Sequence, residues 1–342
     1  MHSRAQAWYG RRTWHWRDWP AQALLDGKRR ADARISVVIP ARDEERTITG
    51  VVGSLRAAVV ERIPLVDEVV VIDSDSADGT AAAAARAGAT VHRARDITPE
   101  LGTYPGKGEA LWKSLLVTEG DLVVFIDADL TQWGPHFVTG LLGPLLADPG
   151  VQLVKGFYAR IATGKDGSTS TEGGRVTELV ARPLLSLWWP ELSGVVQPLA
   201  GEWAARRTLM ESLSIPVGYG VELSTLLDTA ATHGLDAIAQ VDLGSRAHKH
   251  QTDHDLALMA AELLIVADRR RPVSRAGEAG EGPVPASPVL QQFVREDAQV
   301  RPVTRPIPVQ ERPPVAGQLA DRRPAGRDGA GRDGASRDRA RR

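Results

Sequence analysis

The stretch Leu122-Val123-Val124-Phe125-Ile126-Asp127-Ala128-Asp129 decides the fold of this chain. Its apolar and β-branched residues predict a buried strand that ends in two carboxylates. Residues two apart on an extended backbone point the same way, so the side chains of Asp127 and Asp129 converge. Open α/β sheets bind ligands at the carboxyl ends of their strands, and carboxylate oxygens suit Mg²⁺ or Mn²⁺. The alternative interpretation is a strand followed by an acidic turn.

Strands and helices alternate on both sides of this stretch. Apolar runs predict strands at 35–40 and 68–73, and we expect further strands at 90–93 and 151–158, with helices between them. This alternation is typical of an α/β fold with a Rossmann-like, mostly parallel central sheet flanked by helices. Polar clusters follow Pro40, Asp73 and Asp127, which predicts a nucleotide site along one edge of the sheet.

The composition excludes several classes of site. The chain has 342 residues, of which 42% are hydrophobic and 25% charged, with a net charge of −1, as in ordinary globular proteins. It has no cysteine, which excludes disulfides, a thiol nucleophile and a thiolate metal site. We find no apolar run of membrane-spanning length and no signal-peptide pattern, so we expect a cytoplasmic protein without membrane insertion.

The two ends of the chain differ from the middle. Four tryptophans crowd residues 1–30, and we expect this arm to pack against the body or a second subunit rather than bind nucleic acid. Residues 31–160 carry the strand ends predicted to bind the nucleotide, and residues 161–271 contain a loop and a helix start at 175 that could hold an anion. Residues 272–342 are rich in Pro, Gly, Arg and Asp, which predicts a disordered, basic and dispensable tail.

Other nucleotide-binding and metal-binding patterns are absent or incomplete. No G-x-G-x-x-G motif follows the first predicted strand. Residues 102–108 are one residue short of a P-loop, and residues 73–79 depart from a calcium loop in the place of the glycine. These departures favour a nucleotide site built from carboxylates and a metal ion.

Four motifs then carry a resemblance to the GT-A glycosyltransferases that use a nucleotide sugar. They are Val-Val-Ile-Pro-Ala-Arg-Asp-Glu-Glu at 37–45, Asp-Ser-Asp-Ser-Ala-Asp-Gly-Thr at 73–80, Gly-Lys-Gly-Glu-Ala at 106–110 and Asp-Ala-Asp at 127–129. Further motifs at 152–158, 173–185, 218–222 and 239–248 resemble the glucosyl-3-phosphoglycerate synthases among them. The resemblance covers roughly residues 10–268 and implies a GT-A fold whose C-terminal half binds the acceptor.

The resemblance implies transfer of glucose from UDP-glucose to the 2-hydroxyl of 3-phospho-D-glycerate, with retention of configuration and with Mg²⁺ or Mn²⁺ as cofactor. Asp129 and His248 are the metal ligands that it implies. It also implies a homodimer. The donor-binding residues that it implies are Pro40, Ala41, Arg42, Glu44, Ser74, Lys107, Asp127 and Tyr219.

On the acceptor side, the resemblance implies Gly174, Arg175, Thr177 and His250. Phosphoglycerate is an anion, and a guanidinium with backbone N–H groups at a helix start is a fitting receptor for it. His250 stands where the resemblance leads us to expect Asn, which bears on acceptor choice. Glu222, with Asp127, is the implied catalytic pair, and Glu222 either orients the glucose hydroxyls or acts as a base. We favour orientation with same-face attack, because the sequence places no second carboxylate for a double displacement.

Three alternatives remain open from the sequence. A related transferase would use GDP-mannose as donor or glycerate as acceptor. A polyprenyl-phosphate glycosyltransferase would need an amphipathic or spanning segment, which we do not find. A non-catalytic nucleotide-sugar binder would keep the strand-end residues without turnover.

Overall fold

In the computed structural model, residues 2–163, 169–170, 174–247, 253–272, 287–296 and 299–322 are described. The strands are β1 Thr13–His15, β2 Ile35–Ala41, β3 Glu68–Asp73, β4 Thr90–Arg93, β5 Leu122–Phe125, β6 Leu153–Thr163, β7 Thr169–Ser170, β8 Trp203–Arg206, β9 Ile215–Pro216, β10 Ile238–Ala247, β11 Val289–Glu296, β12 Gln299–Pro306 and β13 Glu311–Arg312. The helices are α1 Ser3–Arg12, α2 Ala21–Ala31, α3 Glu45–Leu55, α4 Thr80–Arg86, α5 Lys107–Ser114, α6 His136–Ala147, α7 Arg182–Trp188, α8 Arg207–Ser212, α9 Val221–His233, α10 Asp253–Arg270 and α11 Val315–Arg322.

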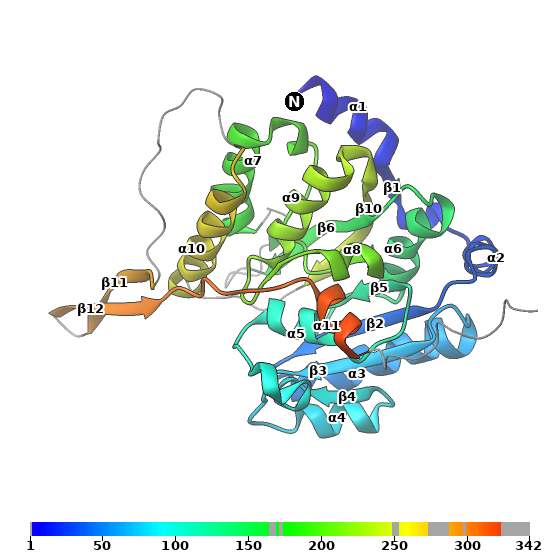
Figure 1. Cartoon of the computed structure of the whole chain (residues 1–342), viewed down its shortest axis with the longest axis horizontal. Helices are drawn as coiled ribbons and strands as arrows, with labels where there is room; N and C mark the ends of the chain where they lie inside the picture. The colour runs from blue at the N-terminus through cyan, green and yellow to red at the C-terminus, as the bar shows by residue number, and fades with distance from the viewer. Residues whose placement is uncertain are drawn as a thin grey trace, which may run out of the picture.

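The main sheet of the described chain has the order β1-β10-β6-β8-β5-β2-β3-β4, with β7 paired to β6 (Figure 1). The pairs β2–β3, β2–β5, β3–β4, β6–β10 and β1–β10 are parallel. Strand β8 is antiparallel to both of its neighbours, β5 and β6. The prediction of a mostly parallel α/β sheet is therefore confirmed, and the antiparallel β8 joins its two halves.

Alternate residues of the central strands pack into two separate hydrophobic cores, one on each face of the sheet. Val38 and Phe125 belong to one core, with residues of α5, α8 and α9. Val37 and Val124, their neighbours in sequence, belong to the other core, with residues of α2, α3 and α6. This is the two-residue period of an extended backbone, and burial on both faces explains why the sequence shows continuous apolar runs. The sheet between two helix layers fixes the strand ends that carry the site.

The N-terminal arm is part of the fold. Strand β1 pairs in parallel with β10 and forms one edge of the sheet. Trp8 of α1 is fully buried, and its indole N–H donates to the carbonyl of Ile238 at 2.9 Å. Trp14, Trp16 and Trp19 pack against the core that contains α6. The expected packing of the indoles against the body is thus seen for the described chain.

The prediction of a disordered tail was wrong for residues 287–296 and 299–322. Strands β11 and β12 form an antiparallel hairpin, and β13 pairs with β9. Val315 of α11 is fully buried in the core that contains α5. A few buried anchors hold this segment, and single anchors leave no periodic signal in a Pro- and Arg-rich sequence. Residues 323–342 lie outside the described residues.

No helix within the described part of the chain is long and apolar enough to cross a bilayer.

Candidate active site

Two carboxylates stand where β5 ends, as the strand pattern predicted. The backbone of Ile126 continues the sheet, since its N–H donates to the carbonyl of Val38 at 3.1 Å. Asp127 and Asp129 follow, with side chains that are 23% and 29% exposed. These two carboxylates are partly exposed to solvent at the end of a buried strand, so they can hold a cationic or polar ligand.

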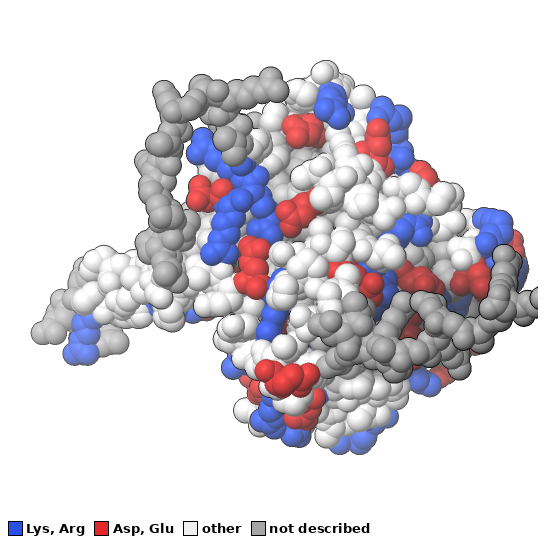
Figure 2. Space-filling view, viewed as in Figure 1, with Lys and Arg blue, Asp and Glu red and all other residues white. Residues whose placement is uncertain are grey.

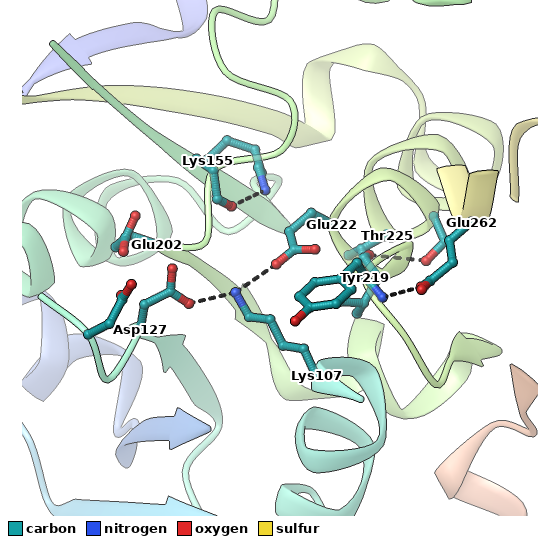
Figure 3. Close-up of polar contacts among 12 residues, drawn as sticks. Lys107, Asp127, Lys155, Glu202, Tyr219, Glu222, Thr225 and Glu262 are labelled. Atoms are coloured by element: carbon teal, nitrogen blue, oxygen red, sulfur yellow. Dashed lines mark hydrogen bonds and ion pairs between the residues drawn. The ribbon is translucent and has the colours of Figure 1, made fainter. Parts of the chain in front are cut away.

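Lys107 joins the strand end to a second carboxylate. Its Nζ lies 2.6 Å from Oδ1 of Asp127 and 2.8 Å from Oε1 of Glu222 (Figure 3). Lys107 is the first residue of α5, and Glu222 lies in the first turn of α9. Burial would lower the pKa of Lys107, but the two carboxylates raise it well above its usual value. The amine is therefore permanently cationic and fixes both carboxylates.

A buried guanidinium lies behind the aspartates. Arg246 of β10 forms an ion pair with Glu202, which is fully buried, and donates to the hydroxyl of Tyr158 at 2.8 Å. Its Nη2 also lies 3.4 Å from both Asp127 and Asp129. Burial favours the neutral acid and raises the pKa of Glu202, whereas the charge of Arg246 opposes that rise. Arg246 thus offsets part of the negative charge of three carboxylates.

The two aspartates differ in their electrostatic surroundings. Burial alone would raise the pKa of Asp127, but Lys107 and Arg246 hold that pKa well below its usual range. Burial and the charge of Asp127 instead raise the pKa of Asp129. Burial and Asp127 therefore outweigh the contact with Arg246, and a further cation nearby would stabilise the ionised form of Asp129.

Glu262 and Lys155 are two further buried groups beside the site. Oε2 of Glu262 accepts the backbone N–H of Tyr219 at 2.6 Å, and burial raises the pKa of this carboxyl to about 7 (Figure 3). Nζ of Lys155 donates to the carbonyl of Ala200 at 2.9 Å, and burial lowers its pKa to about 7. Both groups support the backbone next to Glu222 and Glu202.

Comparison with known proteins places this geometry in a family. Residues 36–194 match the family described as Glycosyl transferase family 2. The chain is 44% identical over 306 residues to the glucosyl-3-phosphoglycerate synthase of Mycobacterium tuberculosis, covering 89% of this chain and 91% of that enzyme. It is 48% identical over 247 residues to the synthase of Petrotoga mobilis, covering 72% of this chain and 76% of that enzyme.

The chain belongs to the glucosyl-3-phosphoglycerate synthase family. A solved structure of the Mycobacterium tuberculosis synthase with Mn²⁺, UDP and glucosyl-3-phosphoglycerate superposes with a TM-score of 0.77 at 43% identity. The superposition covers 90% of this chain and 99% of that one. The GT-A fold expected from the sequence is thereby confirmed.

The residues at the end of β5 fit the divalent cation that the family implies. The carboxylate of Asp129 is a hard, partly exposed oxygen donor beside the second carboxylate of Asp127, which suits Mg²⁺ or Mn²⁺ with water or a diphosphate completing the shell. Within the described residues, no group of three or more metal-binding side chains occurs. His248, the other expected ligand, lies outside the described residues.

The expected donor residues line the ends of β2 and β3. Pro40 and Ala41 end β2, and the carbonyl of Ala41 accepts the N–H of Ser74 at 2.8 Å. Arg42 is exposed beside Asp43, and Glu44 precedes α3. These residues share one edge of the sheet with Asp127, as we expected, because the parallel strands end there together.

The expected acceptor residues are only partly described. Gly174, Arg175 and Thr177 lie where a helical segment leads into α7, with Arg175 exposed and Thr177 buried. His250 lies outside the described residues. Tyr219, expected at the donor, is 41% exposed and lies beside Glu222 (Figure 3). Among the expected site residues, Lys107 forms direct ion pairs with Asp127 and Glu222.

Sequence reasoning did not single out Lys155, Glu202, Arg246 or Glu262. Lys155 carried a readable signal, because it is a charged residue inside an otherwise apolar predicted strand. Arg246 and Glu202 are 44 residues apart in sequence and meet only through the pairing of β10, β6 and β8. Such a pair cannot be found from local spacing.

Proposed function

We propose that this chain is a retaining glucosyltransferase that moves glucose from UDP-glucose to the 2-hydroxyl of 3-phospho-D-glycerate. The observation that carries this function is the 44% identity to the Mycobacterium tuberculosis synthase over 91% of that enzyme. A solved structure of that synthase holds Mn²⁺, UDP-glucose and phosphoglyceric acid together. The similarity spans both halves of the sheet, so it includes the regions expected to bind donor and acceptor.

Residues 31–160 are the donor-binding half in this proposal. Pro40, Ala41, Arg42 and Glu44 border the uridine at the end of β2, with Ser74 beside them at the end of β3. The support is their common edge of the sheet and the hydrogen bond between Ser74 and Ala41. Tyr219 lies beside the sugar.

Lys107 orders the sugar-binding carboxylates. Because its Nζ holds Asp127 and Glu222 at 2.6 and 2.8 Å, both carboxylates can accept hydrogen bonds from hexose hydroxyls without electrostatic repulsion. An ion-paired, buried carboxylate is a weak nucleophile, so Glu222 orients the glucose rather than attacking it. This favours same-face attack by the acceptor hydroxyl, in keeping with retention.

Asp129 holds the divalent cation, together with His248. When bound, the cation offsets the negative charge that develops on the departing diphosphate. Arg246 lies 3.4 Å from Asp129 and keeps its carboxylate at the end of the strand. A homologous structure with Mg²⁺ and UDP supports Mg²⁺ as readily as Mn²⁺.

Residues 161–271 are the acceptor-binding half. Gly174, Arg175 and Thr177 offer a guanidinium and a helix start to the phosphate and carboxylate of phosphoglycerate. His250, outside the described residues, is the fourth acceptor residue of this proposal. Arg175→Ala is expected to raise the acceptor KM with little change in the donor KM. An unchanged acceptor KM would place the acceptor elsewhere.

The function is tested by incubating the purified chain with Mg²⁺, a nucleotide sugar and an acceptor. UDP-glucose with 3-phosphoglycerate should release UDP and yield a product with the mass of glucosyl-3-phosphoglycerate and an α-anomeric NMR signal. GDP-mannose as donor, and glycerate as acceptor, are the comparison arms. Faster release with either of these would overturn the proposed substrates.

We also propose that the chain is a homodimer. The β11–β12 hairpin projects from the body (Figure 1) and exposes Val289, Phe293 and Val303 by 58%, 63% and 37%. Exposed apolar side chains on a projecting hairpin favour a protein contact. A chain without cysteine is compatible with the reducing cytoplasm, and that location stays a prediction.

A further inference from the structure

Residues 309–315, which we call the strap, run across the molecule from the β11–β12 hairpin to α11 (Figure 1). Within the strap, Glu311 and Arg312 pair in antiparallel fashion with Pro216 and Ile215 of β9. The N–H of Val217 then donates to the carbonyl of Gln310 at 3.1 Å. The strap therefore supports the loop that leads from β9 into α9 and Glu222.

Two arginines of α10 fasten the start of the strap. Arg270 lies 2.9 Å from Oε1 of Glu311 and 2.8 Å from Oδ1 of Asp228 in α9. Arg269 donates to the carbonyl of Val309 at 2.6 Å. Basic and acidic side chains lie side by side on this part of the surface (Figure 2). Through Arg270, these contacts tie the strap to α9, the helix whose first turn carries Glu222.

Arg312 is the buried charged residue of the strap. Arg312 as a whole is 7% exposed. Its Nε and Nη2 donate to Oε2 and Oε1 of Glu109, each at 2.7 Å. Nη1 and Nη2 also donate to the carbonyls of Leu101 and Gly102, each at 2.9 Å. A two-pronged, buried guanidinium–carboxylate pair of this kind fixes orientation as well as charge.

Two aromatic rings also contact Arg312, and a further hydrogen bond holds the residue that follows it. The guanidinium lies 4.6 Å from the ring centre of Tyr104 and 4.9 Å from that of Trp112. The indole N–H of Trp112 donates to the carbonyl of Pro313 at 2.7 Å. Arg312 therefore packs against the loop before α5 and against α5 itself.

Glu109, the partner of Arg312, lies two residues from Lys107 in the first turn of α5. Residues two apart in a helix project to opposite sides, so Lys107 faces the active site and Glu109 faces the strap. The N–H groups of Gly108 and Glu109 donate to the carbonyls of Gly218 and Val217 at 3.1 and 2.9 Å. The start of α5 is thus held from the strap side and from the β9–α9 loop at once.

The backbone of this turn is packed without room for adjustment. A Cβ at Gly108 would lie 1.8 Å from the carbonyl oxygen of Pro216, and a Cβ at Gly106 would lie 2.3 Å from that of Val217. Gly106 also has φ of +135°, which favours glycine. A small displacement of the strap would therefore move α5 and the β9–α9 loop together.

We propose that the strap positions the active site, with Arg312 as a positioning residue that sets the place of Lys107 through Glu109. Without Arg312, the buried carboxylate of Glu109 keeps Lys113 of the same helix as a cationic neighbour at 3.6 Å, and the first turn of α5 loses its tie to the strap. Nζ of Lys107 then leaves its place between Asp127 and Glu222. The effect on transfer rests on the proposed function, whereas the effect on Lys107 does not.

The test is Arg312→Gln in the full chain, assayed for UDP release. We expect kcat/KM for UDP-glucose to fall about 10- to 100-fold, because displacement of a positioned group by about 1 Å has effects of this size. Arg305→Gln is the matched control, since Arg305 of β12 makes exposed contacts with the carbonyl of His254 and with Asp255 at the start of α10. Its kcat/KM should stay within about twofold of the unsubstituted chain.

A second measurement follows Lys107 itself and needs no turnover. Reductive methylation, read by mass spectrometry, should be slow at Lys107 in the unsubstituted chain, where its side chain is 14% exposed. Arg312→Gln should accelerate methylation of Lys107 several-fold relative to Lys28, which pairs with Asp67 far from the strap. An inactive unsubstituted chain would remove the proposed function and leave this measurement valid.

Arg312→Lys keeps the positive charge but cannot form the two parallel hydrogen bonds to Glu109. This variant replaces Arg312→Gln in both assays if the glutamine variant does not fold. We expect smaller changes in the same direction for it. The proposal is overturned if the folded variant keeps kcat/KM within about twofold of the unsubstituted chain, or if Lys107 is methylated no faster relative to Lys28.

Discussion

Lys107 separates two carboxylates that would otherwise repel each other, with its Nζ 2.6 Å from Asp127 and 2.8 Å from Glu222. Lys107→Met removes this cation and leaves both acids in a buried site. We expect kcat/KM to fall at least about 100-fold in the UDP-release assay, since an unpaired buried charge also misorients its neighbours. Lys28→Met, at a surface pair, should retain full activity, and equal activities for the two variants would refute the role of Lys107.

Glu262 makes stability depend on pH. Its pKa is about 7 in the folded chain, through burial, and near the ordinary value of 4.5 in the unfolded chain. Between these values the folded state holds a proton that the unfolded state has lost, so the free energy of unfolding decreases as pH rises through this window. The contribution of Glu262 is fully present below the unfolded pKa and is lost as pH passes about 7.

Glu262→Gln removes this titration while keeping an acceptor for the N–H of Tyr219. Relative to the unsubstituted chain, the variant should gain stability by up to roughly 3 kcal/mol between pH 4 and pH 8. Urea unfolding at several pH values measures the difference. A difference that stays constant with pH would show that the carboxyl of Glu262 titrates normally.

At the scale of elements, α1 is tied to the sheet by one side chain. Trp8 is fully buried and donates to the carbonyl of Ile238 in β10. Trp8→Ala should lower the free energy of unfolding by about 3–5 kcal/mol, as for other buried aromatic residues. Tyr9→Ala, at a residue that is 40% exposed, should cost far less in the same denaturation experiment. Similar losses for both variants would contradict the packing of the arm.

The elements that sequence reasoning could predict are those with a long apolar pattern. Strands β3 and β4 have the expected bounds, and β2 extends one residue further than expected. Strand β1 and the strap could not be predicted, because β1 has only three residues and the strap depends on single contacts such as that of Arg312. Tertiary pairing, rather than local pattern, determines such short strands.

The site shows the same division. The position of Asp127 and Asp129 at a strand end could be predicted from the apolar run before them, whereas Lys107 was expected from the family resemblance. The contact of Lys107 with Glu222 joins α5 to α9 and needed the structure. Arg246 of β10 and Glu202, just before β8, form the buried ion pair behind the aspartates and meet only in the folded sheet. Residues that support a site from behind carry little local signal of their role.

At the scale of the whole molecule, the hairpin predicts an assembly. Phe293 is 63% exposed on β11. Phe293→Glu places a charge on the proposed contact, so light scattering should report a monomer where the unsubstituted chain is a dimer. Leu187→Glu, at an apolar side chain that is 74% exposed on α7, is the control for an added charge outside the hairpin. A monomeric unsubstituted chain would remove the dimer proposal.

The two halves of the molecule meet at the end of β5, where the metal is expected. The most direct measurement is anomalous diffraction from a crystal of the full chain soaked with Mn²⁺ and UDP. The account predicts one strong Mn²⁺ peak in direct coordination with the carboxylate of Asp129, and loss of that peak in Asp129→Ala. A Mn²⁺ ion bound away from Asp129, or UDP bound there without any ion, would contradict it.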